Sequence, residues 1–290
     1  MFSRLRSRWS RFLDVYPQIP VRKALGYDNV MGLPISEKAK KYLLETEFDF
    51  VVCDHSGAVI LAIEFDGLGR GFSRDGKYIQ IKDTEDQYRP LKLDAKISAC
   101  EMCDLPIVVV SYPETEPGFD LDIPVTALDA VIAEVLAGRR RQELWKSDLD
   151  ELGEMLASDP SGDTADSFLM GIEIMADMEN PIRRRIQEMQ TELPVPFNQQ
   201  IHPLNDRPGY VGARQSILGG INLSGQSCRE QVLLTCEAYV RTVNCSGCSA
   251  FDLANLLAAY GLLRKAIRTV GRSREAWQRL LNETPFTENS

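Results

Sequence analysis

Two short apolar runs, residues 48–53 and 58–63, constrain the fold more than any other feature of this 290-residue chain. A short polar segment that contains a serine and a glycine separates them. β-Rich runs on either side of a glycine-containing turn are typical of a β-hairpin. A two-residue loop at positions 56–57 would place Asp49 directly opposite Glu64. The sequence therefore predicts an apolar hairpin with acidic side chains at its open end.

Three carboxylates gather at that end of the predicted hairpin. Asp49 lies on the first strand, and Glu64 and Asp66 share a face of the second because side chains alternate along a strand. Directly opposed Cβ atoms are only about 4.5–5.5 Å apart, so the charges would repel and shift one another's pKa values. Hard carboxylate oxygens suit Mg²⁺ or Mn²⁺, which would relieve the repulsion. We therefore expect Asp49, Glu64 and Asp66 to hold one of these metals.

The elements that follow are a helix and a buried strand. Residues 91–100 have the pattern of a helix, which carries Lys92 and Lys96 one turn apart. Residues 105–112 form an apolar run that is typical of a buried strand. The order is thus hairpin, helix and strand, with two lysines available on the helix. Acids at strand ends can also be merely solvated, with Lys96 on an exposed helix face.

This order, with an aspartate, a Glu-x-Asp motif and a helical lysine, resembles the PD-(D/E)XK nuclease superfamily. It is most similar to the uncharacterised branch related to very-short-patch repair endonucleases, in which the hairpin ends in Glu-x-Asp-Gly and the helical lysine precedes a segment like Gly-Ile-Pro-Leu-Leu. Residues 64–67 and 104–108 fill these slots, and residues 16–21 look like the lead-in segment of the branch. The resemblance covers residues 10–113. It implies a restriction-endonuclease-like α/β core, with a central mixed sheet flanked by helices.

The resemblance also implies metal-dependent hydrolysis of nucleic-acid phosphodiester bonds, in DNA more than in RNA. Asp49 and Glu64 would bind the metal, Asp66 would assist, and Lys96 would orient or deprotonate the attacking water. One position departs from the branch, because Arg70 stands where a histidine often follows Asp-Gly. Arginine can hold phosphate but cannot exchange protons near neutral pH. A degenerate core that binds nucleic acid or protein is therefore the alternative function.

Proline and glycine after residue 113 indicate a boundary between a nuclease-like core, residues 1–113, and a second region, residues 114–290. The second region is predicted to be mainly α-helical, with one helix at residues 126–138 and a polar linker near residues 158–166. Its role is open, and one possibility is that it binds a protein partner. Capping-box patterns predict two further helix starts in it, at Ser227 and Ser249.

Seven scattered cysteines include two CxxC pairs, at residues 100–103 and 245–248. Cys100 continues an apolar helical stripe, which favours a buried thiol. If Cys228 and Cys236 lay on one helix they would be about 12 Å apart along its axis, too far to share one zinc ion. We therefore expect Cys245 and Cys248 to be ordinary reduced thiols.

The net charge of −9 argues against a generic polyanion binder. Residues 1–113 nevertheless hold 16 basic and 16 acidic side chains, so this core can carry a local basic groove. No apolar run approaches the roughly 18–20 residues that cross a bilayer, and the basic N-terminus lacks the apolar stretch of a signal peptide. An odd number of scattered cysteines favours a reducing compartment. We therefore expect a cytoplasmic protein without membrane contact.

Overall fold

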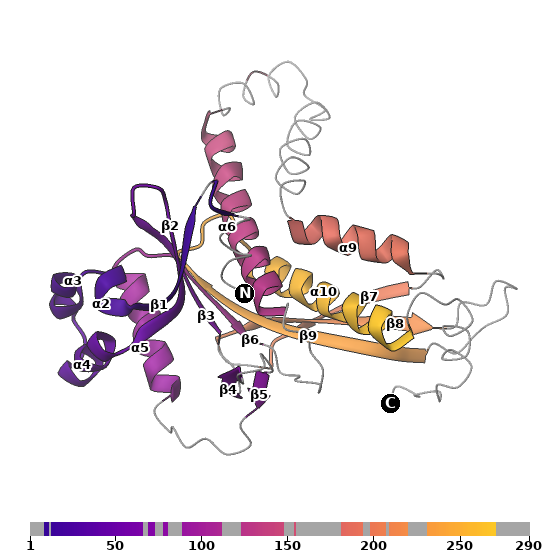
Figure 1. The fold of residues 1–290 in the computed structure, drawn as a ribbon, viewed down its shortest axis with the longest axis horizontal. Coiled ribbons are helices and arrows are strands. Elements are labelled where there is room, and N and C mark those ends of the chain that lie inside the picture. The colour runs from indigo at the N-terminus through magenta and orange to yellow at the C-terminus, as the bar shows by residue number, and fades with distance from the viewer. Residues whose placement is uncertain are drawn as a thin grey trace, which may run out of the picture. The chain divides into compact units, whose positions relative to one another are not determined.

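The computed structural model describes residues 9–11, 13–65, 69–72, 78–80, 89–111, 123–147, 154, 181–193, 198–206, 209–219 and 231–270. These residues form an α/β structure (Figure 1). Clustering of contacts divides the chain into two compact units. The first is Met1–Arg139 with Val240–Ser249, and the second is Arg140–Tyr239 with Ala250–Ser290. The first unit thus extends past residue 113 to Arg139, and it also includes the later segment Val240–Ser249.

One mixed sheet of seven strands contains most of the β-structure in the described residues. Its strands are β1 (Asp14–Pro20), β2 (Glu47–Cys53), β3 (Val59–Phe65), β6 (Ile107–Ser111), β7 (Asn198–Leu204), β8 (Val211–Gly219) and β9 (Gln231–Val243). Their order across the sheet is β1–β2–β3–β6–β9–β8–β7. A separate antiparallel pair, β4 (Gly69–Phe72) and β5 (Tyr78–Gln80), forms a two-stranded sheet.

In the first unit, β1, β2 and β3 are successively antiparallel, and β6 runs parallel to β3. Every residue of β6 is buried, as expected for a strand covered on both faces. The predicted strand at residues 105–112 is therefore confirmed. The parallel pairing of β3 with β6 requires a crossover, and the helix at residues 89–102 lies within it.

The predicted hairpin is formed by β2 and β3. Phe50 pairs with Ile63 and Val51 with Ala62, and continuing this register sets Asp49 opposite Glu64 as expected. The predicted two-residue loop is wrong, because the connection spans residues 54–58 and a bulge follows Val52. Asp54 explains the longer turn, since its Oδ1 accepts hydrogen bonds from the backbone N–H groups at positions 56 and 58, at 2.9 and 3.0 Å.

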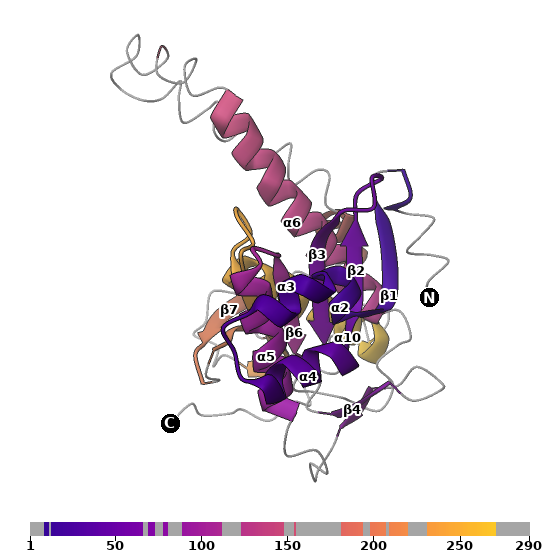
Figure 2. The ribbon, with the colours of Figure 1, turned by 90° about the vertical axis from the view of Figure 1, so that its left-hand side faces the viewer.

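Four helices lie on one side of β1–β3 (Figure 2). They are α2 (Val21–Ala24), α3 (Tyr27–Gly32), α4 (Glu37–Glu45) and α5 (Arg89–Met102). Ser36 caps α4, because its Oγ accepts the N–H of Ala39 at 3.2 Å. Helix α5 confirms the helix predicted at residues 91–100, and its buried side chains include Ile97 and Cys100.

The predicted helix at residues 126–138 is confirmed within α6 (Ile123–Ser147). Its first part, up to Arg139, belongs to the first unit and is tied there by polar contacts at both ends. The indole Nε1 of Trp9 donates to Asp129 Oδ1 at 2.7 Å, and Arg139 Nη2 donates to the carbonyl of Ile60 at 2.7 Å. These contacts are buried or half-buried, so they fix α6 beside the hairpin.

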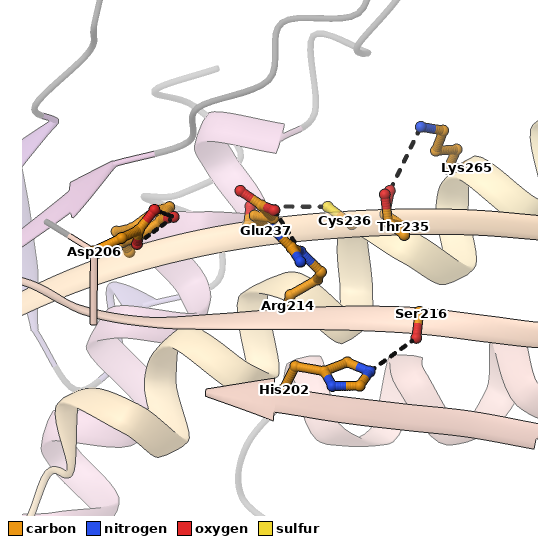
Figure 3. A network of polar contacts seen from close by, with 9 residues as sticks. His202, Asp206, Arg214, Ser216, Thr235, Cys236, Glu237 and Lys265 are labelled. Atoms are coloured by element: carbon orange, nitrogen blue, oxygen red, sulfur yellow. Dashed lines mark hydrogen bonds and ion pairs between the residues drawn. The ribbon is translucent and has the colours of Figure 1, made fainter. Parts of the chain in front are cut away.

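The second unit combines β7, β8 and most of β9 with α9 (Pro181–Glu192) and α10 (Ala250–Val270). Strands β7 and β8 are antiparallel, and α10 packs on both β8 and α9. The helix that begins directly after Ser249 confirms the second capping-box prediction. Polar contacts link neighbouring elements, such as Arg214 to Glu237 at 2.6 Å and His202 to Ser216 at 3.5 Å (Figure 3).

The helix predicted to begin at Ser227 is wrong, because residues 231–243 form the strand β9. Cys236 and residues 238–240 of the strand are buried, whereas Glu237 is half-buried, so burial alternates only over its first part. Several β-branched residues also favour the extended chain. The second region is therefore mixed α and β in its described residues.

Among the described residues, none of the helices combines the length and the apolar character that crossing a membrane requires.

The backbone of α6 packs closely against the segment around Gly247 in the first unit, at Gly138. A Cβ added there would lie 2.6 Å from the carbonyl carbon and oxygen of Gly247, whereas a Cβ added to Gly32 meets nothing within 4 Å. We expect Gly138→Ala to lower the free energy of unfolding by about 1–3 kcal/mol, because backbone cannot yield as a side chain can. Gly32→Ala, the matched helical control, should be neutral or stabilising by up to about 1 kcal/mol. Urea denaturation measures both, and equal effects would contradict this packing.

Candidate functional site

Three of the four predicted site residues come together in the first unit. Asp49 comes from β2, Glu64 from β3 and Lys96 from α5. Asp49 is half-buried, and its Oδ2 accepts the backbone N–H of Phe65 at 2.8 Å. This bond fixes the Asp49 carboxylate beside the end of β3. Adjacent strands and the crossover helix thus deliver one side chain each to the same place.

Lys96 is buried, with 7% of its surface exposed, which corrects the expectation of an exposed or half-exposed lysine. Its Nζ donates to Glu64 Oε1 at 2.7 Å and to the backbone carbonyl of Glu47 at 2.6 Å. The same Nζ lies 5.8 Å from the centroid of the Phe48 ring, within the range of a cation–π contact. An ammonium has three N–H donors, so these two hydrogen bonds leave a third for another acceptor.

Glu64 is the other buried member of this ion pair, with 6% of its surface exposed. The pKa of its carboxyl is raised to about 7, chiefly because the group is buried and in smaller part because of the negative charge of Asp49. The charge and hydrogen bond of Lys96 oppose this shift but do not cancel it. Removal from water therefore outweighs the ion pair, and Glu64 exchanges its proton close to neutral pH.

Asp49 and Glu64 are two neighbouring carboxylates, and such a pair can bind a cation. Within the part of the chain that the structure describes, no group of three or more His, Cys, Asp or Glu is placed to hold a metal ion. Asp66 lies outside the described residues, so its predicted role as a third ligand stays a prediction. Two carboxylates nevertheless fit Mg²⁺, which is commonly held by one or two carboxylates together with substrate phosphates and water.

The other residues that the sequence singled out lie elsewhere or are not described. The ammonium of Lys92 lies 5.2 Å from the ring centroid of Tyr42, a contact with α4. The backbone of Arg70 is part of β4, but its side chain is outside the described set. The backbone carbonyl of Glu47 completes the surroundings of Lys96. Sequence reasoning missed it because a carbonyl is present at every position and leaves no residue-type signal.

The cysteines of the first unit are mostly covered. Cys100 is fully buried, and burial raises the pKa of its thiol above the usual range. Cys245 Sγ donates to the carbonyls of Ile107 and Val243 at 3.5 and 3.3 Å, and burial raises its pKa to about 11. The pair Cys245 and Cys248 lies between β9 and α10, not between two helices as predicted. Both are free thiols in the structure.

Comparisons with protein-family models, with curated proteins and with solved structures found no match to this chain. The chemistry of the site is therefore inferred from its own geometry.

The raised pKa of Glu64 predicts a pH dependence of stability. Between the ordinary value of 4.5 and about 7, the folded chain binds this proton and the unfolded chain does not. The contribution of Glu64 to stability is therefore full at low pH and falls as pH rises through this window, by up to about 3 kcal/mol. Urea denaturation at pH 5 and pH 8 should show this fall relative to the double variant Glu64→Gln/Lys96→Met. A difference between the two proteins that rises with pH would contradict the shift.

The burial of Lys96 predicts that its removal harms the fold. At pH 8, Lys96→Met should cost about 3–5 kcal/mol, because the Glu64 carboxylate would remain buried without its partner. The matched control is Lys92→Met on the same helix, where loss of the contact with Tyr42 should cost about 1 kcal/mol or less. Thermal or urea unfolding measures both variants. Similar losses for the two lysines would show that the ion pair is not a buried one.

Proposed function

We propose that the first unit is a metal-dependent nuclease that hydrolyses phosphodiester bonds, in DNA more than in RNA. The observation that carries this proposal is the convergence of Asp49, Glu64 and Lys96, with the Lys96 ammonium 2.7 Å from the buried Glu64 carboxylate. Two neighbouring carboxylates can hold a divalent metal that activates water for phosphodiester hydrolysis, and a lysine beside them can orient or deprotonate that water.

The order of elements is also consistent with the proposed restriction-endonuclease-like core. An antiparallel meander of β1, β2 and β3 leads through α5 to β6, which is parallel to β3. This is the hairpin, helix and strand order on which the resemblance rested. A fold hosts many functions, however, so the proposal depends on the side chains rather than on the topology.

Each residue has a distinct task in the proposed reaction. Mg²⁺ or Mn²⁺, when bound, would activate water and neutralise the charge that develops on the phosphate. Asp49 and Glu64 would hold the metal, and Glu64 must lose its proton first because only the ionised carboxylate is a ligand. Lys96 would orient the attacking water with the N–H that Glu64 and the Glu47 carbonyl do not use. The pKa of Glu64 near 7 implies that binding of metal releases a proton around neutral pH.

A degenerate core that binds DNA without cleaving it is the second candidate function. The specific observation in its favour is that the Lys96 ammonium already lies 2.7 Å from a carboxylate oxygen of Glu64, so this oxygen has a positive partner without a metal. The presence of Arg70 in place of a proton-exchanging histidine favours the same function. The two candidates share DNA as partner and differ in whether Asp49 and Glu64 take up a metal ion beside the ion pair of Glu64 and Lys96.

The nuclease proposal predicts that the protein with Mg²⁺ or Mn²⁺ nicks plasmid DNA and that EDTA stops the reaction. Glu64→Gln and Asp49→Asn should each lower the cleavage rate by at least about 10²-fold, because each removes a charged ligand. Glu47→Gln is the matched control, since its exposed side chain is not part of the site and only its carbonyl contacts Lys96. Its activity should stay within about twofold of the wild type.

Calorimetry with Mn²⁺ separates the two candidates. The nuclease should bind the ion saturably and release a proton at pH 7, and Glu64→Gln should abolish this binding. The degenerate binder would be favoured if plasmid DNA, single-stranded DNA and RNA all stay uncleaved while the protein still binds DNA. Equal cleavage by the Glu64→Gln and Glu47→Gln variants would exclude the proposed site.

A further inference from the structure

A cavity of about 700 Å³ in the second unit is lined by α9, β7, β8 and α10. Cavities of this volume lie within the usual range for small-molecule sites. The lining is unusual because a row of amide side chains crosses it from one helix to the other. The members of this amide row, in spatial order, are Gln190, Gln199, Gln215 and Asn255.

Each amide in the row donates to the oxygen of the next. Gln190 Nε2 donates to Gln199 Oε1 at 3.2 Å, and Gln199 Nε2 donates to Gln215 Oε1 at 3.0 Å. Gln215 Nε2 then donates to Asn255 Oδ1. An amide has two N–H donors and two lone pairs, so the interior members keep a donor and an acceptor beyond these bonds. Gln215 is only 2% exposed, so the row is buried at this member, whereas Gln190 at its start is exposed.

Two arginines from the first turn of α9, Arg183 and Arg184, supply positive charge to the same cavity. The next residue, Arg185, does not line the cavity, and it forms ion pairs with Glu188 and Glu192 at 2.9 and 3.1 Å. No acidic residue lies in the first turn of α9. The positive end of the helix therefore adds to the two guanidinium groups, a combination that favours an anion.

The two kinds of group lie apart along the cavity. From Arg183 to Gln190 the helix rises by about 10 Å. One carboxylate, that of Asp252, also lines the cavity, in the first turn of α10 where an acid suits the helix dipole. The ligand that fits this layout carries negative charge at one end and a flat edge with alternating donors and acceptors at the other.

We propose that this cavity binds a nucleoside phosphate, with its phosphate at Arg183 and Arg184 and its base against the amide row. Arginine forks match phosphate oxygens, and glutamine and asparagine amides pair with the adjacent donor and acceptor of a base edge. The nucleotide is either free or the end of a longer strand, and the two sources share this chemistry. This cavity is lined by residues of the second unit, whereas the proposed metal site belongs to the first. The two proposals can therefore be tested separately.

Calorimetry of the full chain in EDTA, which prevents metal-dependent cleavage, tests this site. The probes are the four nucleoside 5′-monophosphates, the matching nucleosides, inorganic phosphate and a 5′-phosphorylated four-nucleotide DNA. At least one monophosphate or the oligonucleotide should bind saturably and at least about tenfold more tightly than phosphate or nucleoside alone, because both ends contribute. Affinity that is at least tenfold higher for the oligonucleotide identifies a strand end, whereas equal or weaker affinity identifies the free nucleotide.

Two neighbouring arginines provide a matched pair of variants. Arg184→Gln should weaken binding of the preferred nucleotide at least about tenfold, while Arg185→Gln, with the same change of charge, should leave it within about twofold. Asn255→Ala should weaken nucleotide binding and leave any binding of inorganic phosphate unchanged, because it removes a base contact and the acceptor of Gln215 but neither arginine. Thermal unfolding without ligand verifies that each variant is folded. Absence of binding by all nucleotide probes, equal losses for Arg184→Gln and Arg185→Gln, or equal affinity for phosphate alone would overturn the proposal.

Discussion

The buried ion pair of Glu64 and Lys96 is the constraint on which the first unit depends. Taking two charges out of water costs several kcal/mol for each ion, and their attraction offsets this only when the geometry is good and further hydrogen bonds are made. The structure offers a 2.7 Å contact and the carbonyl of Glu47, and these offset the cost only in part, because the pKa of Glu64 stays raised. One lysine therefore links β2, β3 and α5. The position of the helix relative to the hairpin follows from electrostatics as well as from apolar packing.

Asp49 adds a second negative charge beside the ion pair of Glu64 and Lys96, which a purely structural ion pair does not need. A second negative charge beside Glu64 raises the pKa of its carboxyl, and a cation site gains from such unrelieved repulsion. A purely structural pair would be more stable without it, because like charges destabilise neighbouring strand positions. The fold thus retains the Asp49 carboxylate in a locally unfavourable position beside Glu64. A metal ion bound at the proposed site would make that position favourable. Such local conflicts are expected at functional sites.

Prediction from the sequence succeeded where the signal was local and periodic. The pairing of Asp49 opposite Glu64 agrees with the observed register, although the two-residue loop from which it was predicted is wrong, and helical spacing located Lys96 on α5. It failed where a side chain redirected the backbone, as Asp54 does in the hairpin loop, and where a capping pattern preceded the strand β9. The burial of Lys96 also escaped it, because helical spacing does not reveal what packs over a helix. The amide row was invisible, since its members are scattered between residues 190 and 255 and form no motif.

The amide row has a direction, because every donor in it points from α9 toward α10. Turning one interior amide around would set two oxygens against each other on one side and two NH₂ groups on the other. The four amides can therefore reverse only together, and neighbouring hydrogen bonds in such a chain polarise one another. The row therefore has two possible hydrogen-bond directions. A ligand group that requires an acceptor at one end of the row selects one direction, and this determines whether the other end presents a donor or an acceptor. Selectivity for one base edge would then be a property of the whole row, not of any single glutamine.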